Sequence, residues 1–497
     1  MLNKNKAALA GASSDAILLA AVKIMTLLLG IVTTRLMSQH LSVYDYGTYS
    51  LVLLVANTTA SITILGMMDG INYFFCSEKD AEKREAYLST IYLMQCLVSA
   101  VAGCTIMGCA GVISSSFGNP EAKKWMIFSA ILPFLQNILS MTQVLLMSVG
   151  KARLLAVRNL TVSLLKLGTV LVVVLALKRI TVILMALCIM DAAQILLFAG
   201  ILKKNGCIVR LRSASPRLLR RILHYCVPMA VFILLNTINR DCDKYIIAAF
   251  TDTEILAVYS NASKMLPFDI VMASFITVLL PQITRLIAEK RKKAAAALYR
   301  AFLEVSYIST GILTCAALTA APQLMELLYT KKYLSGLTVF ILYILVDLLR
   351  FTNITLILSA AGKTRTLMGI AVGSVVVNFI LNIFLFRWIG IPGLALATLL
   401  VTCLTGIWLL YFSARELNVG LCKLFDGKYL LFFALTSFAG VAVLKKLVHW
   451  LVGCRIHYIL ILLLVGALYV GGMCLLNGNR LLWNFRKISS FSKKENG

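Results

Sequence analysis

The sequence predicts an all-α membrane protein whose chain crosses the bilayer many times. Hydrophobic residues make up 60% of the 497 residues and charged residues only 14%, and the mean hydropathy is +0.89. Soluble domains do not combine such values. In addition, about fourteen apolar runs follow one another, each long enough to cross a hydrocarbon core of ~30 Å as a helix.

The apolar runs give the expected helices in order. The first run follows Lys4 and Lys6, as in a signal peptide, but Asp15 and Lys23 interrupt it and it continues to Leu36. We therefore expect an uncleaved first transmembrane helix. The expected limits of the spans are 12–37, 46–73, 86–115, 122–149, 152–177, 180–202, 219–250, 254–284, 297–321, 335–361, 364–387, 391–414, 428–452 and 456–476.

The longest basic linker, residues 203–221, lies between the sixth and seventh spans. It contains Ser215-Pro216, a helix-start signal, followed by apolar and basic residues on opposite sides, which predicts a short amphipathic helix on the inner leaflet. The expected organisation is a first lobe over 1–202, this cytoplasmic linker, a second lobe over 222–414, and a C-terminal part over 415–497 with spans thirteen and fourteen and a basic tail. These last two spans show no polar stripe, so we expect lipid-facing additions to a twelve-span core.

The chain carries a net charge of +27. In a soluble protein this would indicate nucleic acid as a partner. Here most Lys and Arg residues stand in short loops, where the positive-inside rule and anionic lipid account for them. We therefore expect membrane lipids rather than nucleic acid as partners, and we expect both termini in the cytoplasm.

Enzyme motifs are absent from the sequence. The 13 cysteines lie mostly within apolar runs, and their spacings do not fit a metal site. There is no Walker loop and no HExxH or GxSxG motif, and the loops are too short for a soluble catalytic domain. We predict no enzyme activity, no metal and no cofactor.

The most informative stretch, residues 236–264, stands between two apolar runs and yet is rich in polar residues. Asn236, Arg240 and Asp243 recur at i, i+4 and i+7, which is one face of a helix, and Asn261 and Lys264 share a face of the next helix. Charges at membrane depth normally face a bundle interior or a wet cavity, which favours a polar, cationic path. The alternative is that Arg240, Asp241, Asp243 and Lys244 sit at a helix end and neutralise one another.

Other predicted spans carry polar side chains at helical spacing. Lys23 and Lys166 fall near the middle of spans one and five, where snorkelling to an interface is difficult, so we expect both to face a cavity. Asp347 and Arg350 form an i, i+3 pair, which we interpret as an ion pair. Further candidates for the polar lining are the amide side chains of Asn57, Gln136, Gln143, Asn159, Asn236, Asn261 and Asn378. Ser and Thr residues are interpreted as interhelical contacts.

An internal repeat is also indicated. Residues 33–50 can be laid over residues 243–260, and both segments end in Tyr-Ser after a helix hairpin. The two segments hold matching positions in the two halves of the chain, and membrane transporters are commonly built from repeated bundles with the binding site between them.

The order of short motifs resembles one known family. Thr34-Arg35-Leu36 ends span one and is followed by Tyr44-Asp45-Tyr46-Gly47-Thr48-Tyr49, while the second half has Asp243-Lys244-Tyr245-Ile246-Ile247, Tyr259-Ser260-Asn261-Ala262-Ser263-Lys264 and Leu280-Pro281-Gln282-Ile283. Over nearly its whole length the chain is similar to the polysaccharide-export branch of the multidrug/oligosaccharidyl-lipid/polysaccharide (MOP) exporter superfamily, which includes O-antigen and capsule flippases. Ala257 departs from the glycine that this family commonly has before the second Tyr, and span two has no Arg or Lys.

The resemblance implies two six-helix lobes around a central cavity with alternating access across a bacterial cytoplasmic membrane. It implies an undecaprenyl-diphosphate-linked oligosaccharide as substrate, used for O-antigen, capsule or exopolysaccharide, and a polysaccharide polymerase and glycosyltransferases as functional partners. The cavity cations of the family correspond here to Lys23, Arg35, Arg240, Lys244 and Lys264. A diphosphate needs such partners in a medium of low dielectric constant, and amide side chains suit sugar hydroxyls.

Other functions are weighed against this flippase hypothesis. A drug/cation antiporter of the same superfamily would need an acidic cavity, for which Asp69, Asp191 and Asp269 are candidates, although basic residues outnumber them. A membrane glycosyltransferase or polymerase would need a large loop outside the membrane, and a scaffold would leave the mid-span charges unexplained. A coupling ion, H⁺ or Na⁺, could bind at Asp243, Asp269 or Asp347.

Overall fold

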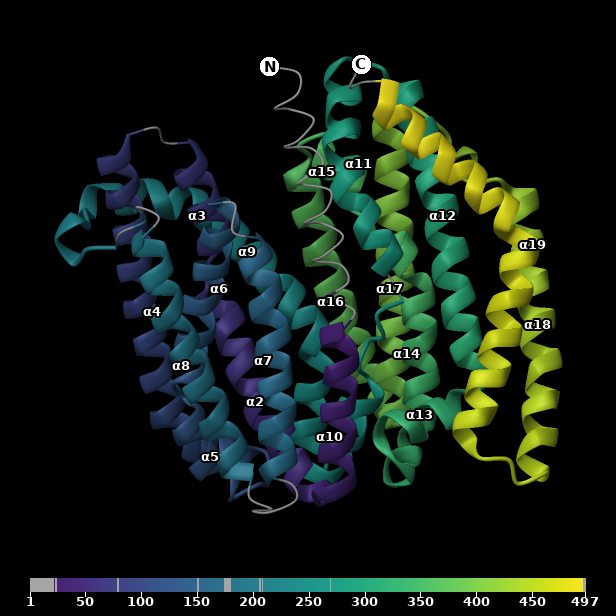
Figure 1. Cartoon of the computed structure of the whole chain (residues 1–497), viewed down its shortest axis with the longest axis horizontal. Helices are drawn as coiled ribbons and strands as arrows, with labels where there is room; N and C mark the ends of the chain where they lie inside the picture. The colour runs from purple at the N-terminus through teal and green to yellow at the C-terminus, as the bar shows by residue number, and fades with distance from the viewer. Residues whose placement is uncertain are drawn as a thin grey trace. The chain divides into compact units, whose positions relative to one another are not determined.

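The computed structural model describes residues 22, 25–77, 80–149, 152–173, 180–204, 207, 209–268 and 270–494. Within these residues the secondary structure is α-helix and short 3-10 helix without a β-strand, as the predicted all-α class requires (Figure 1). Contacts divide the chain into two compact units, Met1–Ala257 and Val258–Gly497. The sequence predicts one lobe up to residue 202 and a second lobe from residue 222. These limits concern the repeated helix bundles and stay a prediction.

Ten helices of the described residues are long and apolar enough to cross a membrane. They correspond to the predicted spans three to six and nine to fourteen. Described helices also lie within the other four predicted spans, which are 12–37, 46–73, 219–250 and 254–284. The protein is therefore a multi-pass membrane protein with the predicted order of spans.

Unit 1 begins with helical residues 25–40. Its further helices are α2 (Val43–Thr63), α3 (Met67–Ser77), α4 (Ala81–Ser116), α5 (Ala122–Ser129), α6 (Leu132–Ser148), α7 (Ala152–Val172), α8 (Ile180–Lys204), the 3-10 turn η2 (Leu211–Ser213) and α9 (Pro216–Phe250), and α10 (Thr253–Ala262) begins within this unit. Buried apolar residues of α3, α4, α6, α8 and α9 form its core.

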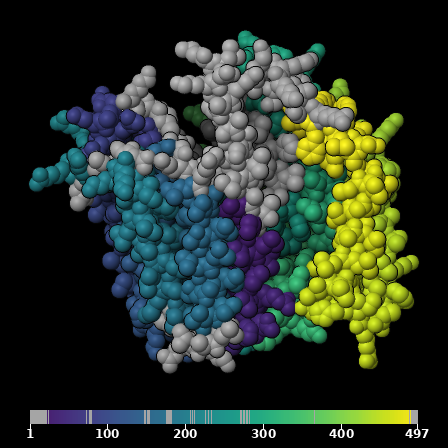
Figure 2. Space-filling view, in the orientation of Figure 1, coloured from purple at the N-terminus to yellow at the C-terminus, as the bar shows by residue number. Residues whose placement is uncertain are grey.

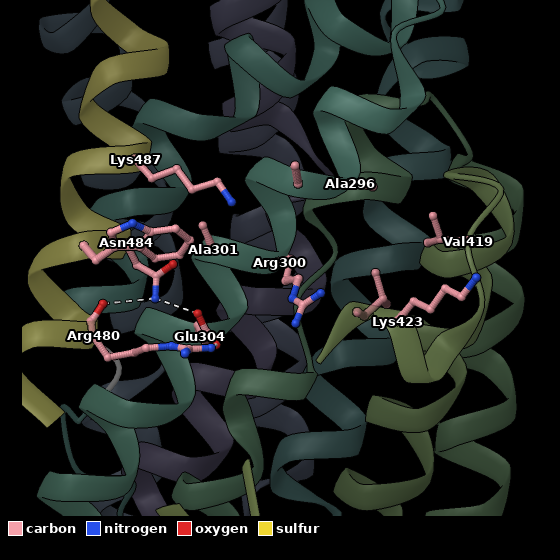
Figure 3. Close-up of a pocket in the computed structure, with 12 residues that line it drawn as sticks. Ala296, Arg300, Ala301, Glu304, Val419, Lys423, Arg480, Asn484 and Lys487 are labelled. Atoms are coloured by element: carbon pink, nitrogen blue, oxygen red, sulfur yellow. Dashed lines mark hydrogen bonds and ion pairs between the residues drawn. The ribbon is translucent and has the colours of Figure 1, made fainter. Parts of the chain in front are cut away.

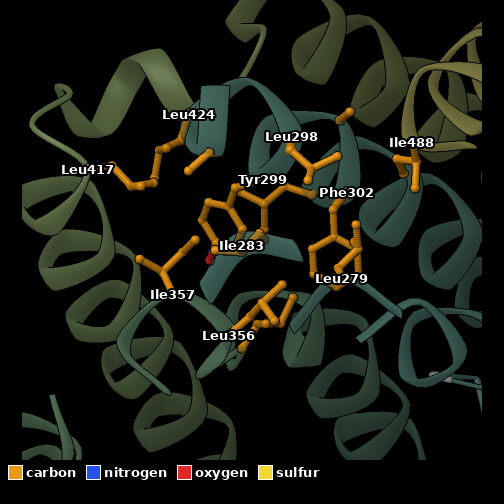
Figure 4. Close-up of a cluster of buried hydrophobic side chains, with 14 of the residues drawn as sticks. Leu279, Ile283, Leu298, Tyr299, Phe302, Leu356, Ile357, Leu417, Leu424 and Ile488 are labelled. Atoms are coloured by element: carbon orange, nitrogen blue, oxygen red, sulfur yellow. The ribbon is translucent and has the colours of Figure 1, made fainter. Parts of the chain in front are cut away.

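Unit 2 contains α11 (Ile270–Ala288), α12 (Lys292–Thr319), α13 (Ala321–Tyr329), η3 (Lys331–Gly336), α14 (Leu337–Leu349), η4 (Arg350–Thr352), α15 (Leu356–Ala360), α16 (Thr364–Ile389), α17 (Ile391–Glu416), η5 (Leu421–Leu424), α18 (Gly427–Gly453) and α19 (Tyr458–Lys494). In one of its core clusters Tyr299 and Phe302 of α12 pack with Ile283, Ile357 and Ile488 (Figure 4). The cluster ties the C-terminal helix α19 to the helices before it.

Predicted spans two, four, eight and ten are each divided into shorter helices. Span two changes from α2 to α3 at residues 64–66, where Leu65 and Gly66 have φ of +46° and +67°. Span eight leaves the helix α10 at residues 263–268 and continues as α11 from Ile270. Hydropathy alone predicts continuous helices here because the interrupting residues are mostly apolar, although Gly66 and Pro267 are the residue types that break helices.

The helix boundaries agree with the repeat register taken from the sequence. That register lays residue 40, the end of the first described helix, over Phe250, the end of α9. It also lays Val43, the start of α2, over Thr253, the start of α10. Spans one and two therefore match spans seven and eight in the local structure of their connections.

The helix predicted in the linker begins where expected but continues further. Pro216 occupies the first turn of α9 after the N-cap residue Ser215, since a missing N–H costs nothing at that position. The helix then runs without interruption to Phe250. The predicted short amphipathic helix is therefore the first part of span seven rather than a separate element, because nothing between residues 221 and 227 breaks it.

Predicted cytoplasmic loops of each unit meet at one end of that unit. In unit 1, Glu85 accepts a hydrogen bond from Ser213 Oγ at 2.7 Å and lies 3.7 Å from Arg210 Nη1. In unit 2, the Glu416 carboxylate lies 3.3 Å from Lys292 Nζ and 3.7 Å from Lys363 Nζ. These contacts agree with the prediction that every second loop lies on the same side of the membrane.

The C-terminal helices α18 and α19 pack against α12 (Figure 1). Their outward side chains are apolar and exposed, with Phe438 76% and Leu475 87% exposed, and the space-filling view shows these helices in yellow as a continuous surface (Figure 2). This agrees with the lipid-facing role expected for spans thirteen and fourteen.

A polar stripe lies on α19 beyond residue 476, which is the predicted limit of span fourteen. Asn477, Arg480 and Asn484 stand at i, i+3 and i+7 on α19. Arg480 Nη2 and Asn484 Nδ2 donate to the buried Glu304 of α12 at 2.8 and 2.6 Å (Figure 3). The stripe is compensated by a carboxylate that lies far away in the sequence, and such a partner cannot be read from the spans themselves.

Candidate functional site

In unit 1 the charged stretch of α9 forms an ion triad. The Asp241 carboxylate accepts from Arg240 Nη2 at 2.9 Å and from Lys244 Nζ at 2.7 Å. The Asp241 side chain is only 8% exposed, whereas those of Arg240 and Lys244 are 54% and 23% exposed. The residues do neutralise one another in part, as the alternative interpretation stated, but the triad places its carboxylate inside and its cations outside.

The expected polar face of Asn236, Arg240 and Asp243 is not uniformly exposed. Asn236 and Arg240 are exposed, while Asp243 is only 2% exposed, and its Oδ1 accepts from the backbone N–H of Lys244 at 2.8 Å. The three positions share a helix face by spacing, but α9 packs against α2, α3 and α4. This packing covers Asp243 and leaves the other two open.

The break in span two is held by amide side chains that the sequence analysis did not select. Gln95 Nε2 of α4 donates to the Thr63 carbonyl at 3.0 Å, and Asn137 Nδ2 of α6 donates to Thr63 Oγ1 at 2.8 Å. Thr63 is the last residue of α2, where helix carbonyls lack intrahelical partners. A lone Gln or Asn within an apolar run was the available signal.

The glycine of the Tyr46-Gly47-Thr48-Tyr49 motif has a packing explanation. A Cβ at Gly47 would overlap the backbone carbonyl of Thr253 and would lie 2.8 Å from Thr253 Cγ2. Beside it, the buried Asn119 Nδ2 donates to Thr48 Oγ1 at 2.8 Å and to Thr253 Oγ1 at 3.2 Å. The motif therefore brings the start of α10 against α2.

In unit 2 the break in span eight is held by Asp347 of α14. Its Oδ2 accepts from the backbone N–H of Leu266 at 2.8 Å, and its Oδ1 lies 3.3 Å from Arg350 Nη1. The Asp347 side chain is 2% exposed and that of Arg350 is 30% exposed. The predicted i, i+3 ion pair is confirmed, and its carboxylate also fixes the backbone of a broken helix.

Lys264 stands at the beginning of this break and its side chain is exposed. Asn261, in the last turn of α10, is buried, with 1% of its surface exposed. On α16, Asn382 Nδ2 donates to Asn378 Oδ1 at 3.0 Å, and both residues are buried. Of these candidates in unit 2, Lys264 has an exposed side chain, whereas the three asparagines are buried.

A second polar cluster lies between α6, α7 and α8 and is organised by Arg158, which the sequence analysis did not select. Arg158 Nη1 donates to Asn159 Oδ1 and Nε donates to Gln194 Oε1, both at 2.7 Å. In the amide orientation that suits its neighbours, Gln143 Oε1 accepts from Arg158 Nη1 at 3.0 Å. The side chains of Gln143 and Asn159 therefore both accept hydrogen bonds from Arg158.

The remaining candidates are placed separately. Gln136 Nε2 donates to the exposed Asn57 at 3.3 Å, which links α6 to α2. Arg35 is half-buried within the helix of residues 25–40, and Lys166 is exposed on α7. Lys23, Asp269 and the side chain of Asp69 lie outside the described residues.

Both units share one chemical arrangement. Each has a broken span whose backbone is held by a polar side chain from a neighbouring helix, and each has a buried carboxylate paired with a more exposed cation. Irregular backbone at membrane depth is tolerated where it lines protein or a wet cavity. Within the described residues, His, Cys, Asp and Glu do not gather in a group of three that could hold a metal ion. Such features are typical of membrane transport proteins.

Residues 34–337 match the family described as "Polysaccharide biosynthesis protein", and the chain belongs to this family. A search of curated proteins found no match. The resemblance stated from the motifs is therefore confirmed at the level of the family.

The fold of this chain is similar to that of solved structures from the MOP superfamily. The chain is similar to a structure titled "Lipid II flippase MurJ, inward closed conformation", with a TM-score of 0.76 and 16% identity over 93% of this chain and 99% of that one. An inward-facing multidrug resistance MATE family transporter has a TM-score of 0.66 and 13% identity over 81% and 98% of the two chains. A MOP superfamily transporter from Pyrococcus furiosus, whose title reports reverse polarity of the binding pocket, has a TM-score of 0.56 and 13% identity over 82% and 94%.

Proposed function

We propose that the protein is a flippase that moves an undecaprenyl-diphosphate-linked oligosaccharide across the bacterial cytoplasmic membrane by alternating access. The oligosaccharide would serve O-antigen, capsule or exopolysaccharide synthesis, together with glycosyltransferases and a polymerase. In this proposal the protein is a transporter rather than an enzyme, and both of its termini are cytoplasmic. The family membership and the fold support the proposal.

One observation carries the choice of an anionic substrate. In both units the carboxylate of the ion pair is buried and the cation is more exposed: Asp241 against Arg240 at 8% and 54%, and Asp347 against Arg350 at 2% and 30%. Lys264 is exposed as well. An antiporter for cationic drugs needs the opposite arrangement, with accessible carboxylates. Exposed Arg and Lys side chains suit a diphosphate, which they bind by charge-assisted hydrogen bonds.

Deletion of the gene in its host tests the proposed function. We expect lipid-linked oligosaccharide to accumulate on the cytoplasmic face of the membrane while surface polysaccharide disappears, and plasmid-borne wild-type protein to restore export. Unchanged surface glycan combined with greater sensitivity to cationic drugs would refute the flippase and favour the antiporter. Assays of the lipid-linked pool and of the surface glycan on the same cells distinguish the two results.

Single substitutions test the proposed cavity cations. We expect Lys264→Ala and Lys23→Ala each to abolish export without loss of protein from the membrane, because each removes a charge that would contact the diphosphate. Lys445→Ala, at an exposed position on α18, is the matched control and should export normally. Wild-type export by both cavity variants would remove these residues from the proposed site.

The coupling ion belongs to the same proposal. H⁺ or Na⁺ would bind at a buried carboxylate, and Asp243 and Asp347 are the candidates within the described residues, with Asp269 as the third candidate from the sequence. Both described carboxylates are almost fully covered, so a change in their exposure during transport would change their affinity for a cation.

A further inference from the structure

A basic groove of about 730 Å³ lies along the first turns of α9 in unit 1 (Figure 1). It is separate from the ion triad in the later part of the same helix. Its lining consists of Arg217, Arg220, Arg221, Leu223, His224 and Val227. These described residues include three arginines and one histidine but no carboxylate, so the groove is cationic.

Two of the arginines carry charges that the fold does not neutralise. Arg217 and Arg220 are exposed, and within the described part of the chain neither forms an ion pair. Glu85 of α4, which packs against the linker, is already engaged. It accepts from Ser213 Oγ at 2.7 Å and lies 3.7 Å from Arg210 Nη1. An anion could therefore bind in the groove without breaking an existing contact of Arg217 or Arg220.

The third arginine is held in place by an aromatic residue. Arg221 Nη1 donates to the Tyr87 hydroxyl at 2.8 Å, and the guanidinium carbon lies 5.8 Å from the centre of the Tyr87 ring. Tyr87 is only 4% exposed and stacks on Phe74, with 4.6 Å between the ring centroids. A guanidinium has five N–H donors. The tyrosine therefore orients Arg221 and leaves further donors for an anion.

The groove rests on a part of α9 that is firmly packed. The backbone N–H of Ser215 donates to Thr90 Oγ1 and that of Arg210 donates to Ser89 Oγ, both at 3.0 Å, which fixes the linker to α4. On the opposite side of α9, Ile222 and Cys226 are fully buried in the core of unit 1. The basic side chains thus project from a backbone that is already positioned.

The same face of α9 changes from basic to apolar along the helix. Positions 217, 220, 224, 227, 231 and 238 follow one another by three, four or seven residues, which places them on one helix face. The last three are Val227, Val231 and Ile238, with exposed fractions of 47%, 39% and 39%. An apolar strip therefore continues from the end of the basic groove.

The length of α9 places this change near the edge of the hydrocarbon core. The helix has 35 residues, about 52 Å at 1.5 Å per residue, whereas the core is ~30 Å thick. Part of α9 must therefore lie outside the core, and basic side chains favour its first turns for that part. This is also the end of unit 1 at which the predicted cytoplasmic loops meet, and the cytoplasmic leaflet is rich in anionic lipids.

We propose that this groove binds an anionic phospholipid of the cytoplasmic leaflet. Arg217 and Arg220 contact the phosphate, Arg221 and His224 donate further hydrogen bonds, and an acyl chain lies along the strip from Val227 to Ile238. A free phosphate ion would use only the basic part. The lining contains no amide side chain for sugar hydroxyls, which favours a phospholipid over the transported oligosaccharide lipid. The test is therefore independent of the proposed flippase function.

The test compares full-length variants by native mass spectrometry in a neutral detergent, titrated with phosphatidylglycerol or with phosphatidylcholine. We expect wild type to prefer phosphatidylglycerol. Arg217→Ala/Arg220→Ala should bind its first phosphatidylglycerol roughly 30-fold more weakly, since two cations near the headgroup are lost. Both arginines are exposed, so the variant should unfold at the same temperature as wild type.

Lys203→Ala/Lys204→Ala is the matched control. It removes the same charge from two exposed lysines in the last turn of α8, also in unit 1, and it should bind phosphatidylglycerol like wild type. Equal affinity of the arginine variant and this control would overturn the proposal, as would equal binding of phosphatidylglycerol and phosphatidylcholine by wild type.

A crosslinking measurement tests the position of the lipid. Phosphatidylglycerol with a photoreactive acyl chain should label the peptide that contains Val227 and Val231 in wild type, and much less in Arg217→Ala/Arg220→Ala. Equal labelling of the two proteins would contradict the site. Displacement of phosphatidylglycerol by inorganic phosphate at similar concentration would show a site for free phosphate. Displacement by an equal amount of undecaprenyl diphosphate would show a site for the transported lipid, and either result would overturn the phospholipid assignment.

Discussion

Gly47→Ala should destabilise unit 1 by roughly 3 kcal/mol, the upper part of the range for overpacked sites. The added methyl group would overlap the Thr253 backbone carbonyl and would lie 2.8 Å from Thr253 Cγ2. A backbone carbonyl cannot rotate away as a side chain can, so the start of α10 must shift from α2. The shift would also lengthen the hydrogen bonds that Asn119 makes to Thr48 and Thr253. The measurement is the midpoint of thermal unfolding of the purified protein in detergent.

Gly108→Ala is the matched control for this substitution. Gly108 lies within α4, and a Cβ there would meet no atom within 4 Å. Alanine favours a helix over glycine by about 0.5–1 kcal/mol, so the control should be neutral or slightly more stable. If Gly47→Ala unfolded at the same temperature as Gly108→Ala, the close approach of α2 and Thr253 would be contradicted.

Asp347→Ala should destabilise unit 2 by about 1–3 kcal/mol, which is typical when a buried hydrogen-bonding group loses its partner. The substitution leaves Arg350 without its carboxylate and the Leu266 N–H without its acceptor. Span eight would lose the contact that fixes its break, next to Lys264. We expect low abundance of this variant in the membrane and an early unfolding transition in detergent.

Asp347→Asn separates the structural role from a role in coupling. Asparagine keeps an oxygen for the Leu266 N–H but has no charge, so we expect a smaller loss of stability than with alanine. If Asp347 binds the coupling ion, export should also fail while the protein remains in the membrane. A double-mutant cycle with Arg350→Ala measures the energy of the pair, and additive effects of the two single substitutions would contradict the observed ion pair.

The difference between predicted and observed helices is concentrated in the broken spans. Apolar runs predicted the order of the spans correctly, because a bilayer demands long apolar helices. The breaks at 64–66 and 263–268 lie inside apolar runs, and a hydropathy average is little affected by single residues such as Gly66 and Pro267. Backbone groups at the breaks are satisfied by Gln95 and Asp347 from other helices, and Asn137 binds the Thr63 hydroxyl. No local pattern reveals these partners.

The candidate residues also divide into those that helical spacing placed correctly and those that it did not. Spacing correctly paired Asp347 with Arg350, because residues three apart on a helix are neighbours. Spacing also grouped Asp243 with Asn236 and Arg240, but packing of α9 buries Asp243. Gln143 and Asn159 were expected to face sugar hydroxyls, and in the structure they bind Arg158.

The sequence by itself determined that this is a basic, all-α, multi-pass membrane protein with a repeated helix hairpin and polar residues in its spans. Composition and periodicity are sufficient for this conclusion, because the preference of a residue for water or lipid depends on its type. Only the tertiary structure decided which charge of each ion pair is exposed, why Gly47 must be a glycine, and that Tyr87 holds Arg221 while Arg217 and Arg220 stay exposed. These properties depend on contacts between residues far apart in the chain, and helical spacing carries no information about them.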